Sequence, residues 1–344
     1  MMGSAFVLMF VALLLWLTLG LRLCVALASR YLRSGRRAAC RRVMAVFRAF
    51  PRDLGGADVT SYFRIRLASD EAHTSSAIAE LERAIDAMPN QLTQALRSAS
   101  LADIWVNAGC YHSAILAPRL FGWRALRRRY PDVFGIAHIN RAEALHNVGR
   151  NDLALKLLAR APRVSAIAKN GGLALEAWIL ADIGRASAAK ELFNRIDPRP
   201  LSPYYASEMC FTRALIALTS GDYESALIAA SDGLARVVRA SSERNGLFLL
   251  GRIEALRGNL EQAIAHYERG RWHRYRGQSA RGLFELGQLY EQQNLPQVAH
   301  AAYAQAIEED AESAAAARCR ARLDRLAPLR VAEPVAEVPT ASTV

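Results

Sequence analysis

The stretch LFELGQLYEQQNLPQVAHAAYAQA, residues 283–306, contains two short segments with helical periodicity that are joined by a turn. Apolar and small residues recur three or four positions apart in each segment, and Asn294, which tolerates a left-handed turn, lies between them. The positions that carry this pattern are Leu283, Leu286, Gly287, Tyr290, Asn294, Ala299, Tyr303 and Ala306. The pattern predicts two helices that pack against each other as a hairpin.

The same hairpin pattern recurs along most of the chain as a glycine followed five residues later by an alanine. The pairs are Gly109/Ala114, Gly149/Ala154, Gly184/Ala189, Gly221/Ala226 and Gly258/Ala263, with Ala72/Ala77 before them and Asn294/Ala299 after them. Successive alanines from Ala77 onward are 37, 40, 35, 37, 37 and 36 residues apart, which is the length of one helix-turn-helix repeat. Glycine suits a left-handed turn after the first helix, and alanine allows the second helix to pack closely.

These repeats resemble the tetratricopeptide repeat (TPR), clearly in the last three units and more weakly upstream. The resemblance covers roughly residues 59–326. It implies an all-α fold, a TPR-like right-handed helical solenoid of about seven helix pairs. The alternative is an irregular all-helical domain. Strands are not expected, because no long alternating β-branched run separates the segments.

The amino-terminal residues predict a single transmembrane helix. No charged residue occurs from Met1 to Leu21, and a helix of that length would span a bilayer core. Arginines follow this run and none precedes it, so the positive-inside rule places the solenoid in the cytoplasm, at the inner membrane. The alternative is a signal peptide that is cleaved after Ala28.

A basic amphipathic segment follows the apolar run. Its arginines, which we expect at the membrane surface, are Arg30, Arg33, Arg36, Arg37, Arg41 and Arg42. The formal net charge of the chain is +12. Eleven arginines and two aspartates lie between Arg22 and Arg66, which gives +9 there and leaves +3 for the rest. This distribution favours anionic lipid over nucleic acid as a partner, although the segment's apolar face could instead cap the solenoid.

The chain therefore divides into four predicted parts. Residues 1–28 are the transmembrane anchor, 29–58 the basic juxtamembrane segment, 59–326 the solenoid and 327–344 a disordered tail. The five cysteines form no CxxC pair, and the seven histidines form no HExxH motif. We find no catalytic constellation, metal site or cofactor motif, and so we do not expect an enzyme.

The TPR resemblance implies a concave groove lined by the first helix of each repeat. Carried onto this chain, the groove positions that we expect to bind a partner are Phe211, Asn245, Phe248, Arg252, Arg281, Phe284 and Gln288. One aromatic residue per repeat, flanked by amide and guanidinium groups, would suit an extended peptide or a helix that carries an acidic group. The alternative is that the three phenylalanines only pack between helices.

The overall layout resembles bacterial inner-membrane TPR proteins of the LapB and HemY types. This chain lacks the paired CxxC module of LapB and the second spanning segment of HemY-type proteins. The resemblance implies a membrane-anchored scaffold that recruits protein partners at the cytoplasmic membrane face, in envelope or polysaccharide assembly. The alternative is an exported or soluble TPR regulatory protein that binds peptide or nucleic acid.

Overall fold

The structure is a computed structural model of the full chain. It describes residues 19–20, 23–24, 26–28, 30–31, 37–47, 102–120, 127–128, 130–161, 165–197, 203–273, 275 and 278–326. Most of the predicted anchor, the repeat expected between residues 59 and 101, and the tail from 327 lie outside these ranges. The number of seven helix pairs therefore stays a prediction.

The described residues are helical and contain no strand. Residues 102–107 form a helical turn before α6. The helices before the regular pairs are α2 (Arg37–Phe47) and α6 (Tyr111–Leu120). The paired helices are α8 (Pro131–Asn147) with α9 (Asn151–Arg160), α10 (Ala166–Asp182) with α11 (Ala186–Phe193), α12 (Pro203–Thr219) with α13 (Tyr223–Ala235), α14 (Ala240–Arg257) with α15 (Leu260–Arg271), and α16 (Ala280–Gln292) with α17 (Pro296–Glu309). The last described helix is α18 (Ala314–Leu326).

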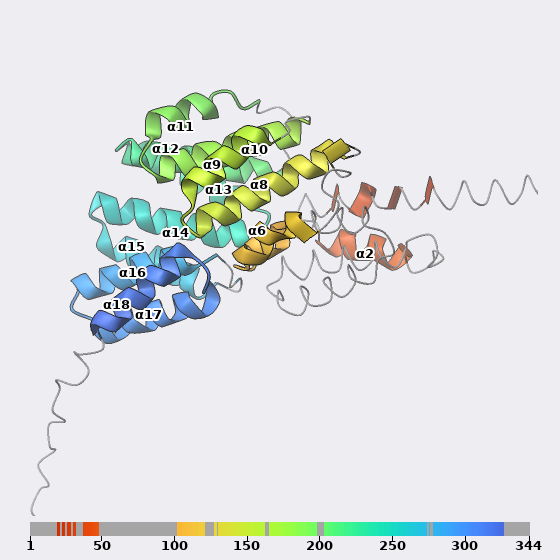
Figure 1. Ribbon diagram of the computed structural model, residues 1–344. Coiled ribbons are helices and arrows are strands. Elements are labelled where there is room, and N and C mark those ends of the chain that lie inside the picture. The colour runs from red at the N-terminus through yellow and green to blue at the C-terminus, as the bar shows by residue number, and fades with distance from the viewer. Residues whose placement is uncertain are drawn as a thin grey trace, which may run out of the picture.

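The helix pairs stack in chain order, from α8 in yellow to α18 in blue (Figure 1). Each first helix packs on its own second helix and on the first helix of the next pair, as α10 packs on α11 and on α12. This arrangement is a helical solenoid, in which each hairpin buries its apolar face against its neighbours. The solenoid predicted from the repeats is confirmed.

The turn glycines adopt the predicted left-handed conformation. Their φ angles are +78° at Gly109, +83° at Gly149, +81° at Gly184, +80° at Gly221 and +87° at Gly258. Asn294 takes the equivalent place in the last pair, with φ +59°. The six alanines that follow these turns are fully buried: Ala114, Ala154, Ala189, Ala226, Ala263 and Ala299. The repeat signature therefore encodes both the turn and the close helix contact after it.

Phenylalanines pack between neighbouring pairs, in spaces left by glycines. The ring of Phe211 lies against Gly233 and Gly246, where an added Cβ atom would come within 2.5 Å and 2.6 Å of the ring. Phe248 occupies the equivalent space one repeat later, between the second helix of its own pair and the first helix of the next. The two phenylalanines are only 2% and 7% exposed. They join consecutive pairs into one core.

The last repeats contact the first described helices, so the solenoid curves back on itself. We call this contact the seam; it joins residues 106–112 to Tyr275, Gln278 and residues 309–312. The Gln278 amide donates a hydrogen bond to the Val106 carbonyl at 3.1 Å, and the Tyr275 hydroxyl donates to the Asn107 carbonyl. The backbone N–H of His112 donates to Glu312 Oε2 at 2.7 Å.

Among the residues that the structure describes, no helix is long and apolar enough to cross a membrane. Residues 1–18, which carry most of the predicted spanning helix, lie outside the described ranges. Of the predicted membrane-surface arginines, Arg30, Arg41 and Arg42 are exposed. Arg37 begins α2, and Arg33 and Arg36 lie outside the described residues.

Candidate functional site: a central cavity

The first helices of the five pairs surround a cavity of about 560 Å³. Its wall is made by α8, α10, α12, α14 and α16, and is completed by Asp103 and by Asn107 and Gln278 of the seam. Apolar side chains such as Ile136, Leu175 and Trp178 share this wall with amide and charged groups. A cavity of this size, with a few polar groups in an apolar lining, has the character of a ligand-binding site.

The cavity lining follows the repeat register. The residues 13, 10 and 6 positions before each turn glycine line the cavity in α8, α10 and α12. They are Ile136, Ile139 and Glu143; Gly171, Ala174 and Trp178; and Glu208, Phe211 and Leu215. The same register gives Asn245, Phe248 and Arg252 in α14 and Arg281 in α16. The helical period turns these positions to one side of each first helix.

Five of the seven predicted groove residues line this cavity: Phe211, Asn245, Phe248, Arg252 and Arg281. Phe284 and Gln288 lie in α16, the first helix of the last pair, and do not line the cavity. Phe284 is 7% exposed and packs instead on Tyr303, with a ring centroid distance of 5.8 Å, and under the guanidinium of Arg318. The burial of all three phenylalanines agrees with the packing alternative, while the binding role of the seven residues stays a prediction.

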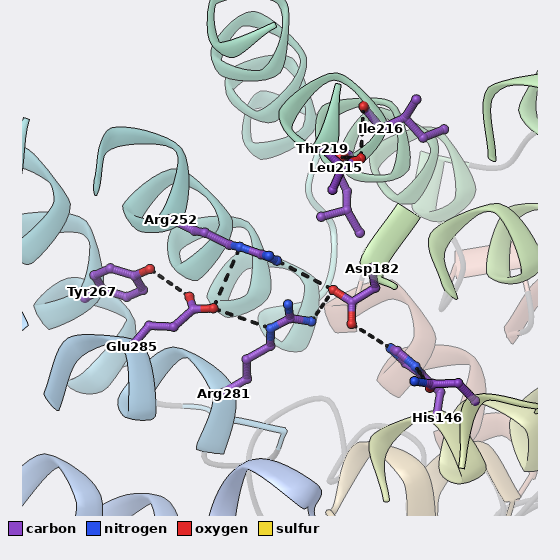
Figure 2. Close-up of polar contacts among 10 residues, drawn as sticks. His146, Asp182, Leu215, Ile216, Thr219, Arg252, Tyr267, Arg281 and Glu285 are labelled. Carbon is purple, nitrogen blue, oxygen red and sulfur yellow. Dashed lines mark hydrogen bonds and ion pairs between the residues drawn. The ribbon is translucent and has the colours of Figure 1, made fainter. Parts of the chain in front are cut away.

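Arg252 and Arg281 each lie between two carboxylates (Figure 2). Arg252 NH1 is 3.5 Å from Asp182 Oδ1, and its Nε is 3.8 Å from Glu285 Oε1. Arg281 donates to the same Asp182 oxygen, and its Nε is 3.5 Å from Glu285 Oε1. The Tyr267 hydroxyl donates to the other Glu285 oxygen at 2.8 Å. The two arginines that we expected to meet an acidic partner are therefore already paired within the chain.

His146 extends this network on the other side of Asp182. Its Nε2 atom is 3.6 Å from Asp182 Oδ2, and its Nδ1 atom is 2.7 Å from Asn151 Oδ1. Burial lowers the pKa of His146, although Asp182 opposes this effect. Burial alone would raise the pKa of Asp182, but the positive charge of Arg281 and the contacts with His146 and Arg252 hold it below its ordinary value. Asp182 is thus held as a carboxylate that ties α8, α10, α14 and α16 together.

A second cluster of acidic residues lies on the side of the cavity that α8 and α12 form. Burial and the negative charge of Glu208 raise the pKa of Glu143 to about 7, against a hydrogen bond of 3.3 Å from Gln278 Nε2. Burial also raises the pKa of Glu208, although the Ser242 hydroxyl donates to it. The charge of Asp103 acts on Glu143 in the same direction as Glu208. This side of the cavity therefore carries clustered acidic groups.

The raised pKa of Glu143 predicts a pH-dependent effect of Glu143→Gln. Ionising Glu143 costs more in the folded chain than in the unfolded chain, so it destabilises the fold increasingly as pH rises from about 4.5 to about 7. The amide keeps the acceptor for Gln278 without that cost. We expect the Tm difference between variant and wild type to grow between pH 5 and 7.5 in favour of the variant, and then to level off.

Differential scanning calorimetry at four pH values across that range measures this difference. Glu224→Gln makes the same chemical change at a carboxylate that is 72% exposed, and should move Tm little throughout. A Tm difference for Glu143→Gln that is constant with pH would contradict the assignment.

The acidic residues Glu143, Asp182 and Glu285 are site residues that our sequence prediction missed. A signal for Glu143 exists in the repeats, because it lies 6 positions before Gly149. Asp182, by contrast, lies near the end of α10 and carries no mark in the repeat pattern. Its role depends on three other first helices that only the assembled solenoid brings together.

Comparison with known proteins identifies the fold of this chain but assigns it to no sequence family. No protein-family model matches the chain, and no curated protein matches its sequence. Among solved structures, the APC/C hetero-tetramer Cut9–Hcn1 aligns with a TM-score of 0.52 and 14% identity over 86% of this chain. This chain spans only 54% of that chain. The Rap protein complexed with competence and sporulation factor aligns with a TM-score of 0.51 and 13% identity, over 92% of this chain and 98% of its own.

A tetratricopeptide repeat protein from Parabacteroides merdae is also similar, with a TM-score of 0.48 and 14% identity over 78% of this chain and 99% of its own. The structural neighbours Cut9 and Rap are TPR proteins, and their likeness extends over most of this chain. The fold is therefore that of a TPR solenoid. Folds of this class present a concave surface made by first helices, and here that surface encloses the central cavity.

Proposed function

We propose that this protein is an interaction scaffold that receives an extended segment of a protein partner in its central cavity. The observation that carries this proposal is the cavity itself, whose apolar and polar lining comes from the first helices of five consecutive pairs. A lining built at one register of successive repeats forms an elongated surface, which suits a chain segment with several side chains. One structural neighbour was solved as the hetero-tetramer Cut9–Hcn1 and another, Rap, in complex with competence and sporulation factor, which is consistent with binding.

Gly171 offers a direct way to close the cavity. It lines the cavity from α10, and an added Cβ atom would make only ordinary contacts, the nearest at 3.6 Å from Tyr205. Gly171→Ala should therefore leave the cavity open and the fold intact, whereas the ring of Gly171→Phe should fill part of the cavity. We expect wild type and Gly171→Ala to enrich the same peptides from a displayed library of random twelve-residue sequences, and Gly171→Phe to enrich none of them.

Circular dichroism of the two variants controls for folding. Retention of the same peptides by Gly171→Phe would contradict binding in the cavity. Failure of the wild-type chain to enrich any peptide would contradict the proposed function.

We also propose that residues 1–28 tether the solenoid to a membrane, with 29–58 on the lipid surface and 59–326 facing the cytoplasm. The support is the uncharged run at the amino end, together with Leu19 and Leu23, which are both 61% exposed. Tethering would raise the local concentration of the cavity near other membrane components, as in envelope assembly. Mass measurement of the amino terminus in isolated membranes tests this: an intact Met1 or Met2 is expected, and cleavage after Ala28 would favour the exported form.

A further inference from the structure

The charges around the central cavity are distributed unequally. Arg252 and Arg281 contact Asp182 and Glu285, so these two positive charges are matched by two negative charges. On the other side, Asp103, Glu143 and Glu208 line the cavity together with one arginine, Arg239. Arg239 acts on both Glu143 and Glu208. Among the described residues, Glu143 and Glu208 thus present two carboxylates to the single guanidinium whose charge acts on them, and we call this side of the cavity the acidic wall.

Each of the two glutamates of the acidic wall accepts a side-chain hydrogen bond from another described residue. Glu143 accepts from the Gln278 amide at 3.3 Å, and Glu208 accepts from the Ser242 hydroxyl. Both donors are neutral, whereas each glutamate oxygen can accept more than one hydrogen bond. Carboxylates held near each other in a partly apolar cavity favour a cation between them. The charge that is missing from this wall is positive.

Asn140 provides an independent sign of a missing ligand. It lies three residues before Glu143 on α8, and both residues line the cavity. The Asn140 side chain is 9% exposed, and its Nδ2 atom has no hydrogen-bond partner among the described residues. An unpaired buried amide costs free energy that a carbonyl acceptor in the cavity would recover. A peptide main chain supplies such a carbonyl.

We propose that the partner segment places a lysine or arginine side chain between Glu143 and Glu208, with a main-chain carbonyl accepting from Asn140. This inference deepens the proposed function and depends on it. The apolar stem of the cationic side chain would lie along Ile136 and Ile139, which line the same part of α8. The site thus selects a basic segment, in contrast to the acidic partner that the sequence alone suggested through Arg252 and Arg281.

Positional twelve-residue peptide libraries test this inference on the full chain. In each library one position is fixed as Lys, Arg, Gln or Glu and the others vary. We expect bound peptides to favour Lys or Arg at one position over Gln and Glu. The variant Glu143→Gln/Glu208→Gln should lose this preference, with binding of the best Lys peptide weakened roughly tenfold or more. Its binding of the matched Gln peptide should change less than about twofold.

Two further measurements keep the test decisive. Raising salt from 50 to 500 mM should weaken wild-type binding of the Lys peptide more than that of the Gln peptide, and this needs no variant. A peptide of residues 29–50 of this chain is included as a competitor; if it binds more tightly than any library peptide, the occupant is the chain's own basic segment and the assignment to a partner fails.

The remaining outcomes separate this inference from the proposed function. Peptides that bind with no preference for Lys or Arg, or with a preference for Glu, would overturn the acidic-wall assignment and leave the proposed function standing. A wild-type chain that binds no peptide would overturn both.

Discussion

Replacing Arg244 by alanine should destabilise the protein by about 3–5 kcal/mol, because it removes the positive charge that faces the buried carboxylate of Glu309. Arg244 lies in α14 and is fully buried. Its NH2 atom is 2.7 Å from Glu309 Oε2 at the end of α17, and its Nε donates to the Gly270 carbonyl at 2.8 Å. The guanidinium thus joins three helices beside the seam. Urea denaturation of the full chain should show a lower midpoint with an unchanged slope.

An exposed ion pair of nearly the same length provides the control. Arg257 NH2 is 2.6 Å from Glu224 Oε1, but the Glu224 side chain is 72% exposed. Glu224→Ala should therefore cost less than about 1 kcal/mol. The double variant Arg244→Met/Glu309→Leu, which removes both buried charges, should recover much of the loss. A loss below about 1 kcal/mol for Arg244→Ala would contradict its role as a joint between helices.

Gly282→Ala should destabilise the protein by about 1–3 kcal/mol, although alanine is the better helix former. An added Cβ atom would lie 2.3 Å from Cγ of Phe248, the ring atom that is bonded to the Phe248 Cβ atom. The ring has little room to move away, because it packs closely on Gly270 of α15 as well, where an added Cβ atom would come within 2.5 Å of it. Since Phe248 also lines the cavity, the substitution should disturb the cavity wall as well as the core.

The same glycine-to-alanine change at Gly171 should stabilise the protein instead of destabilising it. Its nearest contacts for a new Cβ atom are ordinary, so Gly171→Ala should stabilise the protein by roughly 0.5–1 kcal/mol. Thermal denaturation of both variants measures the contrast. Combining Gly282→Ala with Phe248→Leu should cost less than the sum of the single changes, because both act on one contact. Equal Tm shifts for the two glycine variants would contradict the packing described here.

The local features of the fold were predictable because they depend on short-range geometry. The left-handed φ at Gly221 and the close packing at Ala226 both depend on residues within one hairpin. The repeat spacing in the sequence then predicts where the next hairpins lie. The inner face of the first helices was predictable in the same way, since its register is fixed relative to the turn. Five predicted groove residues line the cavity for this reason.

The seam and the pairing of the arginines could not be predicted from the repeats. The Gln278 amide meets the Val106 carbonyl across 172 residues, and Asp182 meets Arg281 across 99. Such contacts depend on how small rotations between repeats accumulate along the solenoid, which no single repeat encodes. Arg252 and Arg281 looked available in the sequence because Asp182, which both arginines contact, lies in another repeat.

Site-specific photocrosslinking tests the central claim, that a partner segment occupies the cavity. Benzoylphenylalanine would replace Trp178, which lines the cavity from α10, or Ile228, which is 63% exposed on α13. In cells that make the protein, we predict a crosslink from position 178 that maps to one extended segment of one partner, and none to that segment from position 228. Crosslinks to the partner only from position 228, or none from position 178, would contradict the account.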